Sequence, residues 1–206
     1  MSYDLKQIKG YDLVVIDGRT FLIDTGSPSF IIEPVTINGV VCYGQKNQRV
    51  LQNLSDTFGF NVEIIGYDII SRFRILTVNK FSKFVEFGEP NINLEYSIPM
   101  KNYMVDVVFN GVVTKGYMDT GAPNVMAHES LLTNAKYIGE VIEPTMTGPN
   151  NYTSYESVLE INNNKLIVNA LKLNKLNYGI QLFFSISMFA KTQYVIDLNK
   201  DTIYYE

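Results

Sequence analysis

The stretch Phe21-Leu22-Ile23-Asp24-Thr25-Gly26-Ser27-Pro28 returns in the second half of the chain as Tyr117-Met118-Asp119-Thr120-Gly121-Ala122-Pro123. In each copy an apolar run ends in the triplet Asp-Thr-Gly, which is followed by a small residue and a proline. One such triplet indicates little more than a turn, because aspartate and glycine are ordinary turn formers. Two copies in matching surroundings indicate an internal duplication, with a pair of purely structural turns as the alternative.

A second pair of matching segments follows the triplets in the same order. These segments are Ile64-Ile65-Gly66-Tyr67-Asp68 in the first half and Phe183-Phe184-Ser185-Ile186-Ser187 in the second. Ser185 stands where the first copy has Gly66. We therefore predict a first lobe over residues 1–88, a linker over residues 89–100 and a second lobe over residues 101–206.

The residue pattern favours strands throughout. Short β-branched or aromatic runs alternate with turn dipeptides such as Asp17-Gly18 and Asn110-Gly111. Helical periodicity is confined to short segments around residues 68–73, 130–135 and 187–192. The sequence predicts a mostly β fold of two homologous lobes with short helices.

Composition narrows the possible functions. The 206 residues are 46% apolar and carry a net charge of −4, which fits a globular chain and argues against a nucleic-acid-binding surface. No apolar run reaches the roughly 20 residues that span a bilayer. The first residues lack the basic stretch and apolar core of a secretory signal, so we expect a cytoplasmic protein.

A single cysteine and a single histidine limit the available chemistry. Cys42 excludes an internal disulfide and a cysteine cluster for metal, and we expect it to be a buried packing residue. Serine, cysteine or zinc hydrolase chemistry would depend on His128, which we expect at the surface or at a helix start. We expect no metal and no cofactor, and proton transfer by carboxyl groups.

Asp24 and Asp119 are the candidate catalytic residues. Two carboxyl groups brought together by symmetric loops cannot both ionise cheaply, so one stays protonated and the pair titrates jointly. Such a pair can take a proton from a water molecule and give one to a substrate carbonyl. Ser27 can hydrogen-bond the outer oxygen of Asp24 whereas Ala122 cannot, so we expect the two halves to be electrostatically different.

The other triplet residues are expected to hold the loops in place. Gly26 and Gly121 allow a sharp turn and a close approach of the two backbones. Thr25 and Thr120 can each hydrogen-bond to the opposite loop and fix the positions of the carboxyl groups.

The two motifs and the segments downstream of them resemble the pepsin and retroviral-protease family of aspartic peptidases. The resemblance implies two six-stranded-type β lobes of the aspartic-protease fold and an endopeptidase that acts on extended peptides. It also implies that each loop is braced by two large apolar residues and a glycine. Residues 64–66 fit this pattern, and residues 183–185 fit it except that Ser185 replaces the usual glycine. The length resembles two retroviral-sized lobes fused in tandem, which implies a monomer with an intramolecular pseudo-dimer.

The resemblance further implies a flap hairpin after each loop. Residues 40–51 read as the first hairpin, with Tyr43, Gly44 and Gln45 near its tip. Residues 141–159 read as the second, with Gly148 and Pro149 in its tip. Ordinary surface hairpins are the alternative for both.

Two other functions stay open on the sequence. One is a peptide-binding or scaffold module that keeps the fold without turnover. The other is a processing enzyme that cuts only itself or one partner.

Overall fold

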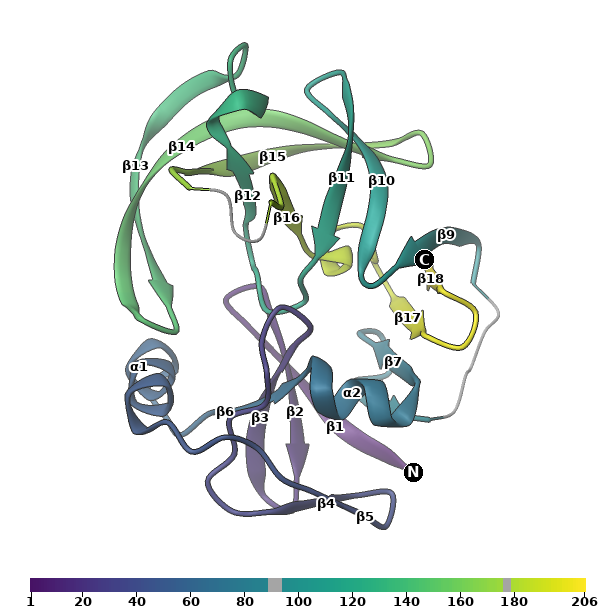
Figure 1. The fold of residues 1–206 in the computed structure, drawn as a ribbon. Helices are drawn as coiled ribbons and strands as arrows, with labels where there is room; N and C mark the ends of the chain where they lie inside the picture. The colour runs from purple at the N-terminus through teal and green to yellow at the C-terminus, as the bar shows by residue number, and fades with distance from the viewer. Residues whose placement is uncertain (89–93, 176–178) are drawn as a thin grey trace.

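The computed structural model describes residues 1–88, 94–175 and 179–206 and is mostly β with short helices, which confirms the mostly β part of the predicted fold class (Figure 1). The first half contains β1 (Ser2–Ile8), β2 (Tyr11–Ile16), β3 (Arg19–Asp24), β4 (Val35–Ile37), β5 (Val40–Cys42), α1 (Gln48–Phe58), β6 (Glu63–Gly66), α2 (Tyr67–Phe73), β7 (Ile75–Asn79) and β8 (Phe84–Phe87). The second half contains β9 (Tyr96–Lys101), β10 (Met104–Phe109), β11 (Val112–Met118), β12 (Val125–His128), η1 (Glu129–Leu131), β13 (Lys136–Thr145), β14 (Gly148–Ile161), β15 (Asn164–Leu173), β16 (Leu182–Phe184), η2 (Ile186–Met188), β17 (Gln193–Asp197) and β18 (Thr202–Tyr205).

Both halves place the Asp-Thr-Gly triplet in the same sheet environment. β3 pairs antiparallel with β2 and parallel with β6, and Asp24 lies opposite Gly66. β11 pairs antiparallel with β10 and parallel with β16, and Met118 lies opposite Phe184. The two strands that carry the triplets therefore have equivalent neighbours.

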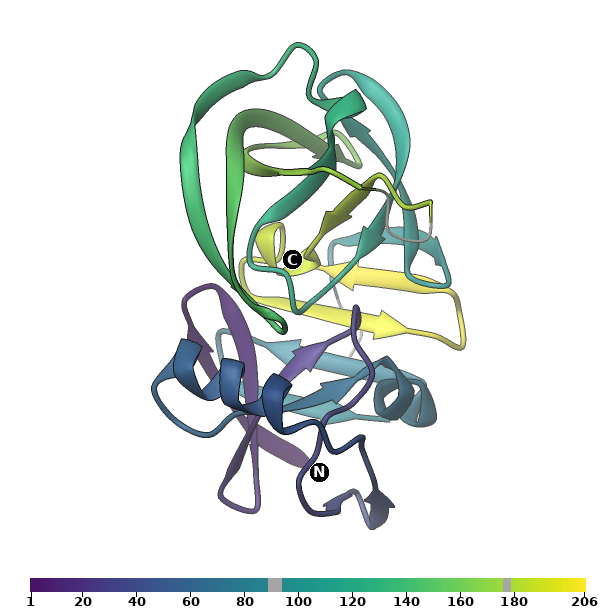
Figure 2. The same ribbon diagram turned by 60° about the vertical axis from the view of Figure 1, so that its left-hand side comes forward.

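The halves are joined by a continuous sheet. β7 pairs antiparallel with β17, so that β1, β8 and β7 from the first half run into β17, β18 and β9 from the second. Figure 2 shows the yellow strands of the second half lying along the blue strands of the first. Of the predicted linker, residues 89–93 lie outside the described residues, and Tyr96–Lys101 forms strand β9.

A buried carboxylate reinforces the junction between the halves. Asp12 in β2 is 1% exposed and accepts hydrogen bonds from Ser187 Oγ at 3.0 Å and Tyr194 OH at 2.9 Å. Lys80 Nζ donates to the carbonyl oxygens of Ser187 and Ala190 at 2.6 and 2.8 Å. These contacts fix η2, which follows β16, against the first half.

The predicted first hairpin at residues 40–51 is wrong. Val40–Cys42 is the second strand of the small β4–β5 hairpin, and helix α1 starts at Gln48. Asn47 caps this helix by accepting from the backbone N–H of Val50, and Gly59 ends it at φ 80°. An apolar stripe formed by Val50, Leu54 and Phe58 is buried, as expected for an amphipathic helix.

The other short helices are close to prediction. Residues 68–73 lie in α2, and the segments at 130–135 and 187–192 begin in the short 3₁₀ helices η1 and η2. Within the part of the chain that the structure describes, no helix has the length and apolarity to cross a lipid bilayer.

Candidate active site

The two Asp-Thr-Gly loops meet at the centre of the molecule (Figure 1). A Cβ atom placed on Gly26 would lie 2.3 Å from Asp119 Oδ2, and one placed on Gly121 would lie 2.3 Å from Asp24 Cγ. Each carboxyl group is therefore packed against the glycine of the opposite loop, at a distance that excludes any side chain there. The loops bring Asp24 and Asp119 side by side.

Thr25 and Thr120 link the loops reciprocally. The backbone N–H of Thr25 donates to Thr120 Oγ1, and that of Thr120 donates to Thr25 Oγ1, both at 3.0 Å. The hydroxyl groups in turn donate to the carbonyl oxygens of Met118 and Ile23, at 2.8 and 2.9 Å respectively. These are the cross-loop hydrogen bonds that the sequence predicts for the two threonines.

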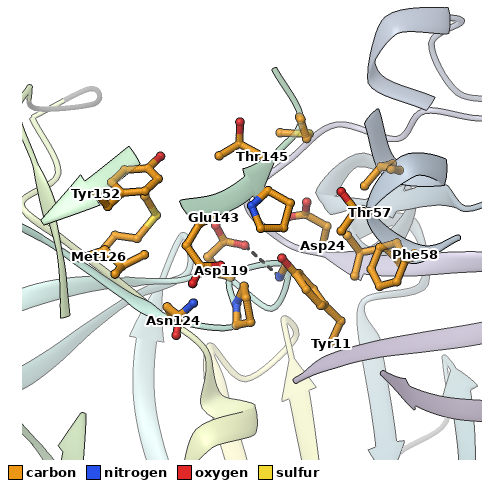
Figure 3. Close-up of a pocket in the computed structure, with 18 residues that line it drawn as sticks. Tyr11, Asp24, Thr57, Phe58, Asp119, Asn124, Met126, Glu143, Thr145 and Tyr152 are labelled. Atoms are coloured by element: carbon orange, nitrogen blue, oxygen red, sulfur yellow. Dashed lines mark hydrogen bonds between the residues drawn. The ribbon is translucent and has the colours of Figure 1, made fainter. Parts of the chain in front are cut away.

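Backbone donors orient the carboxyl groups. The N–H of Gly26 donates to Asp24 Oδ1, and the N–H of Gly121 donates to Asp119 Oδ1, both at 2.9 Å; the latter bond is drawn dashed in Figure 3. The predicted bond from the Ser27 hydroxyl to Asp24 is wrong. Ser27 Oγ instead donates to the carbonyl oxygen of Pro28 at 2.8 Å, because the chain turns back at this point.

The two buried carboxyl groups are electrostatically coupled. Burial and the neighbouring Asp119 carboxyl group raise the pKa of Asp24 well above its usual range, although hydrogen bonds from the backbone of Gly26 and Ser27 oppose the effect. Burial also raises the pKa of Asp119, but hydrogen bonds from Asp24 and from the backbone of Gly121 and Gly26 oppose the effect. Since both pKa values are raised and the groups are coupled, the two carboxyl groups titrate as a pair that retains a proton where isolated aspartates would both be ionised.

The threonine contacts predict a large stability effect. In Thr25→Val the buried N–H of Thr120 would lose its acceptor and the carbonyl of Met118 its donor. Since each buried group left without a partner costs about 1–3 kcal/mol, we expect Thr25→Val and Thr120→Val each to lower the free energy of unfolding by about 2–4 kcal/mol. Urea unfolding measures this, with Thr36→Val at an exposed position of β4 as the control. A loss no larger than that of the control would contradict the role of the threonines.

A cavity of about 290 Å³ opens above the two carboxyl groups (Figure 3). The first half lines it from β2, β3 and α1, and the second half from the Asp119 loop and from the hairpin of β13 and β14. Its lining residues are Tyr11, Leu22, Asp24, Leu54, Thr57, Phe58, Asp119, Gly121, Ala122, Pro123, Asn124, Met126, Glu143, Pro144, Thr145, Met146, Tyr152 and Leu171. Burial, Glu143 and the two aspartates raise the pKa of Tyr11 to about 12, so that its hydroxyl stays neutral.

The predicted second hairpin is present as β13 and β14. Its tip turns at Met146 and Thr147, and it reaches helix α1 of the first half, as Figure 2 shows. Asn53 Nδ2 donates to the carbonyl oxygen of Met146 at 2.8 Å, and Ser27 Oγ lies 3.4 Å from Met146 Sδ. The hairpin therefore spans the site from one half to the other. Thr145 and Met146 line the cavity, whereas the predicted Gly148 and Pro149 follow the turn and do not.

The predicted residues of the first hairpin are not at the cavity. Tyr43 is 62% exposed and, with Gly44 and Gln45, is absent from the cavity lining. The backbone N–H of Gln45 donates to Ser29 O at 2.8 Å, and a Cβ on Gly44 would lie 2.8 Å from the Ile31 nitrogen. This segment is held extended against the chain that follows the first loop, so it cannot cover the site.

His128 and Cys42, the single histidine and the single cysteine, do not line the cavity. His128 ends β12 and accepts a hydrogen bond from the backbone N–H of Ser130 at the start of η1. Cys42 is buried in the core. Among the residues with defined positions, no cluster of three or more His, Cys, Asp or Glu side chains could hold a metal ion.

Sequence reasoning missed the contributions of α1, Tyr11 and Glu143 to the cavity. The four-residue spacing of Val50, Leu54 and Phe58 is the signal that could have identified the helix. No local signal marks Tyr11 or Glu143, because their place at the cavity depends on how the two halves pack.

Searches with the sequence found no matching protein-family model and no matching curated protein.

Proposed function

We propose that the protein is an aspartic endopeptidase with two lobes of the aspartic-protease fold and a catalytic pair formed by Asp24 and Asp119. The observation that supports this proposal is the close opposition of two buried carboxyl groups, one from each copy of a duplicated loop, at the base of a cavity. Burial and mutual coupling favour a single proton held by the pair, which can then act both as proton donor and as proton acceptor in peptide hydrolysis.

The reaction can be written with these two groups and one water molecule. The Asp119 carboxylate takes a proton from the water, whose oxygen attacks the carbonyl carbon of the peptide bond. Asp24 gives its proton to the carbonyl oxygen, which yields a neutral tetrahedral intermediate. The proton held by Asp119 then passes to the leaving nitrogen while the C–N bond breaks, and Asp24 recovers a proton from the collapsing hydroxyl.

The surroundings of the pair suit an extended peptide. The cavity has apolar walls on both sides of the carboxyl groups, from Leu54 and Phe58 on α1 and from Met126 and Leu171 on β12 and β15. The β13–β14 hairpin offers a strand-like backbone across the site. Both aspartates come from one chain, so a monomer is the proposed active species.

The test is inhibitor-sensitive cleavage of unfolded substrate. We expect the protein to cut mixed peptides and a reduced, alkylated protein between about pH 3 and pH 7, and a statine-type transition-state inhibitor to abolish the cleavage. Mass spectrometry of the products identifies the cleavage sites, and sedimentation of the active sample gives its oligomeric state. Binding of the inhibitor without cleavage would favour the peptide-binding module, and a single cut in one partner would favour the processing enzyme. Activity only in an associated form would contradict the monomeric active species.

A further inference from the structure

We propose that Glu143 forms a subsite for a positively charged side chain, so that the peptides bound at this cavity carry lysine or arginine near the scissile bond. This inference rests on the proposed function for the position of the peptide, and it concerns a contact that the catalytic pair does not make.

The position of Glu143 on β13 directs it to the cavity. Neighbouring residues of a strand face opposite sides, and Ile142 is 71% exposed. Glu143 and Tyr152 lie on the inner face of the hairpin and both line the cavity. Figure 3 shows Glu143 between the side formed by Tyr152 and Met126 and the side formed by Tyr11 and Phe58.

The cavity is acidic and contains no counter-charge. Its lining includes the carboxyl groups of Asp24, Asp119 and Glu143 and no lysine, arginine or histidine. The ion pairs between residues that the structure describes do not involve Glu143. Its charge is therefore available to a ligand.

The walls around Glu143 favour a long cationic side chain. Pro144, Met146 and the ring of Tyr11 provide apolar surface along which the stem of lysine or arginine can pack while its head reaches a carboxylate. Partial exclusion of water by these walls strengthens the attraction between opposite charges. An acidic side chain at the same place would be repelled by Glu143 and by the ionised member of the aspartate pair.

The experiment measures binding of peptides whose register is fixed by a statine residue placed at the catalytic pair. Lysine, glutamine or glutamate is placed in turn at each of the three positions on either side of the statine. Calorimetry gives the Kd of each peptide for the unmodified protein, for Glu143→Gln and for Glu140→Gln. Glu140 lies on the same strand but is exposed and outside the cavity, so its substitution removes the same charge elsewhere.

At one of the peptide positions beside the statine, we expect the unmodified protein and Glu140→Gln to bind the lysine peptide about tenfold more tightly than the glutamine peptide. In Glu143→Gln this ratio is expected to fall to about one. In Glu143→Lys the glutamate peptide is expected to become the preferred ligand. Equal affinities at every position, a lysine preference that survives in Glu143→Gln, or no binding of any of the peptides overturns the proposal.

Cleavage of the same peptides without statine separates the two proposals. Lysine-dependent binding without hydrolysis would refute the endopeptidase and leave the subsite standing. Hydrolysis with no dependence on Glu143 would refute the subsite alone.

Discussion

Asparagine in place of Asp119 is expected to lower kcat/KM for peptide hydrolysis by at least about 10³-fold, the scale at which general acid–base catalysis contributes. The amide side chain would still accept the hydrogen bond from Gly121 but could not take a proton from water. Asp24→Asn is expected to cause a loss of similar size, because the substrate carbonyl would lose its proton donor. Cleavage of a fluorogenic peptide measures both effects.

The control for this prediction is Asp106→Asn, which removes an exposed carboxylate that pairs with Lys115 on the surface. We expect that variant to keep full activity. Near-normal hydrolysis by either Asp24→Asn or Asp119→Asn would remove the pair from the mechanism.

The same Asp24→Asn variant is expected to be more stable than the unmodified protein at neutral pH. Asp24 has a raised pKa in the folded state, so from about pH 3.8 upwards the unfolded chain releases a proton that the folded chain retains. The free energy of unfolding of the unmodified protein therefore falls as the pH rises through this window. Asparagine does not titrate, so the Asp24→Asn variant does not lose this stability. Urea unfolding at pH 3, 5 and 7 should show a stabilisation that is near zero at pH 3 and grows to about 1 kcal/mol or more at pH 7. An advantage that did not change with pH would contradict this assignment.

The second large effect is expected for Gly66→Ala. A Cβ atom at this position would lie 2.2 Å from the carbonyl oxygen of Ser27 and 2.6 Å from the backbone nitrogen of Ser29. These are backbone atoms of the loop that follows Asp24, and they are held by the hydrogen bond from Tyr67 N to Ser27 O at 2.9 Å. Because no rotamer change can relieve the clash, we expect the free energy of unfolding to fall by more than about 3 kcal/mol.

The duplicated chain supplies a matched control for this substitution. Ser185 occupies the equivalent position in the second half, where its side chain accepts a hydrogen bond from Ser187 N at the start of η2. Ser185→Gly should cost only a few tenths of a kcal/mol, as usual for glycine at a helix N-cap. Calorimetric unfolding compares the two variants. A similar loss of unfolding free energy in Gly66→Ala and Ser185→Gly would contradict the role of close backbone packing at Gly66.

The pairing of the two Asp-Thr-Gly loops could be predicted from the sequence, because the motif occurs twice in matching surroundings. Thr25 and Thr120 could be assigned to cross-loop hydrogen bonds, since two symmetric loops that meet must satisfy each other's buried donors. Whether those loops act in peptide hydrolysis stays a prediction. The mostly β class could also be predicted, because short β-branched or aromatic runs and turn dipeptides are local features of the sequence.

The sequence reasoning failed where the two halves differ. Residues 40–51 were assigned to a flap hairpin from the family resemblance, but the chain enters helix α1 at Gln48, with a cap at Asn47 and an apolar stripe ending at Phe58. The predicted hydrogen bond from the Ser27 hydroxyl to Asp24 is wrong because the local turn directs this hydroxyl to the carbonyl oxygen of Pro28. Glu143 was missed because its contacts depend on tertiary packing, which no local pattern records.

The pairing of β7 with β17 has a consequence for the synthesis of the protein. The register joins Asn79 to Gln193 and Ile75 to Asp197, so the strand pair that joins the halves connects residues separated by more than half of the chain length. Contacts so distant in sequence form slowly, and they cannot form on a ribosome until the later partner has left the exit tunnel. The junction between the halves is thus completed only after residues 193–197 have emerged, and a nascent chain cannot hold its two halves in their final arrangement before that moment.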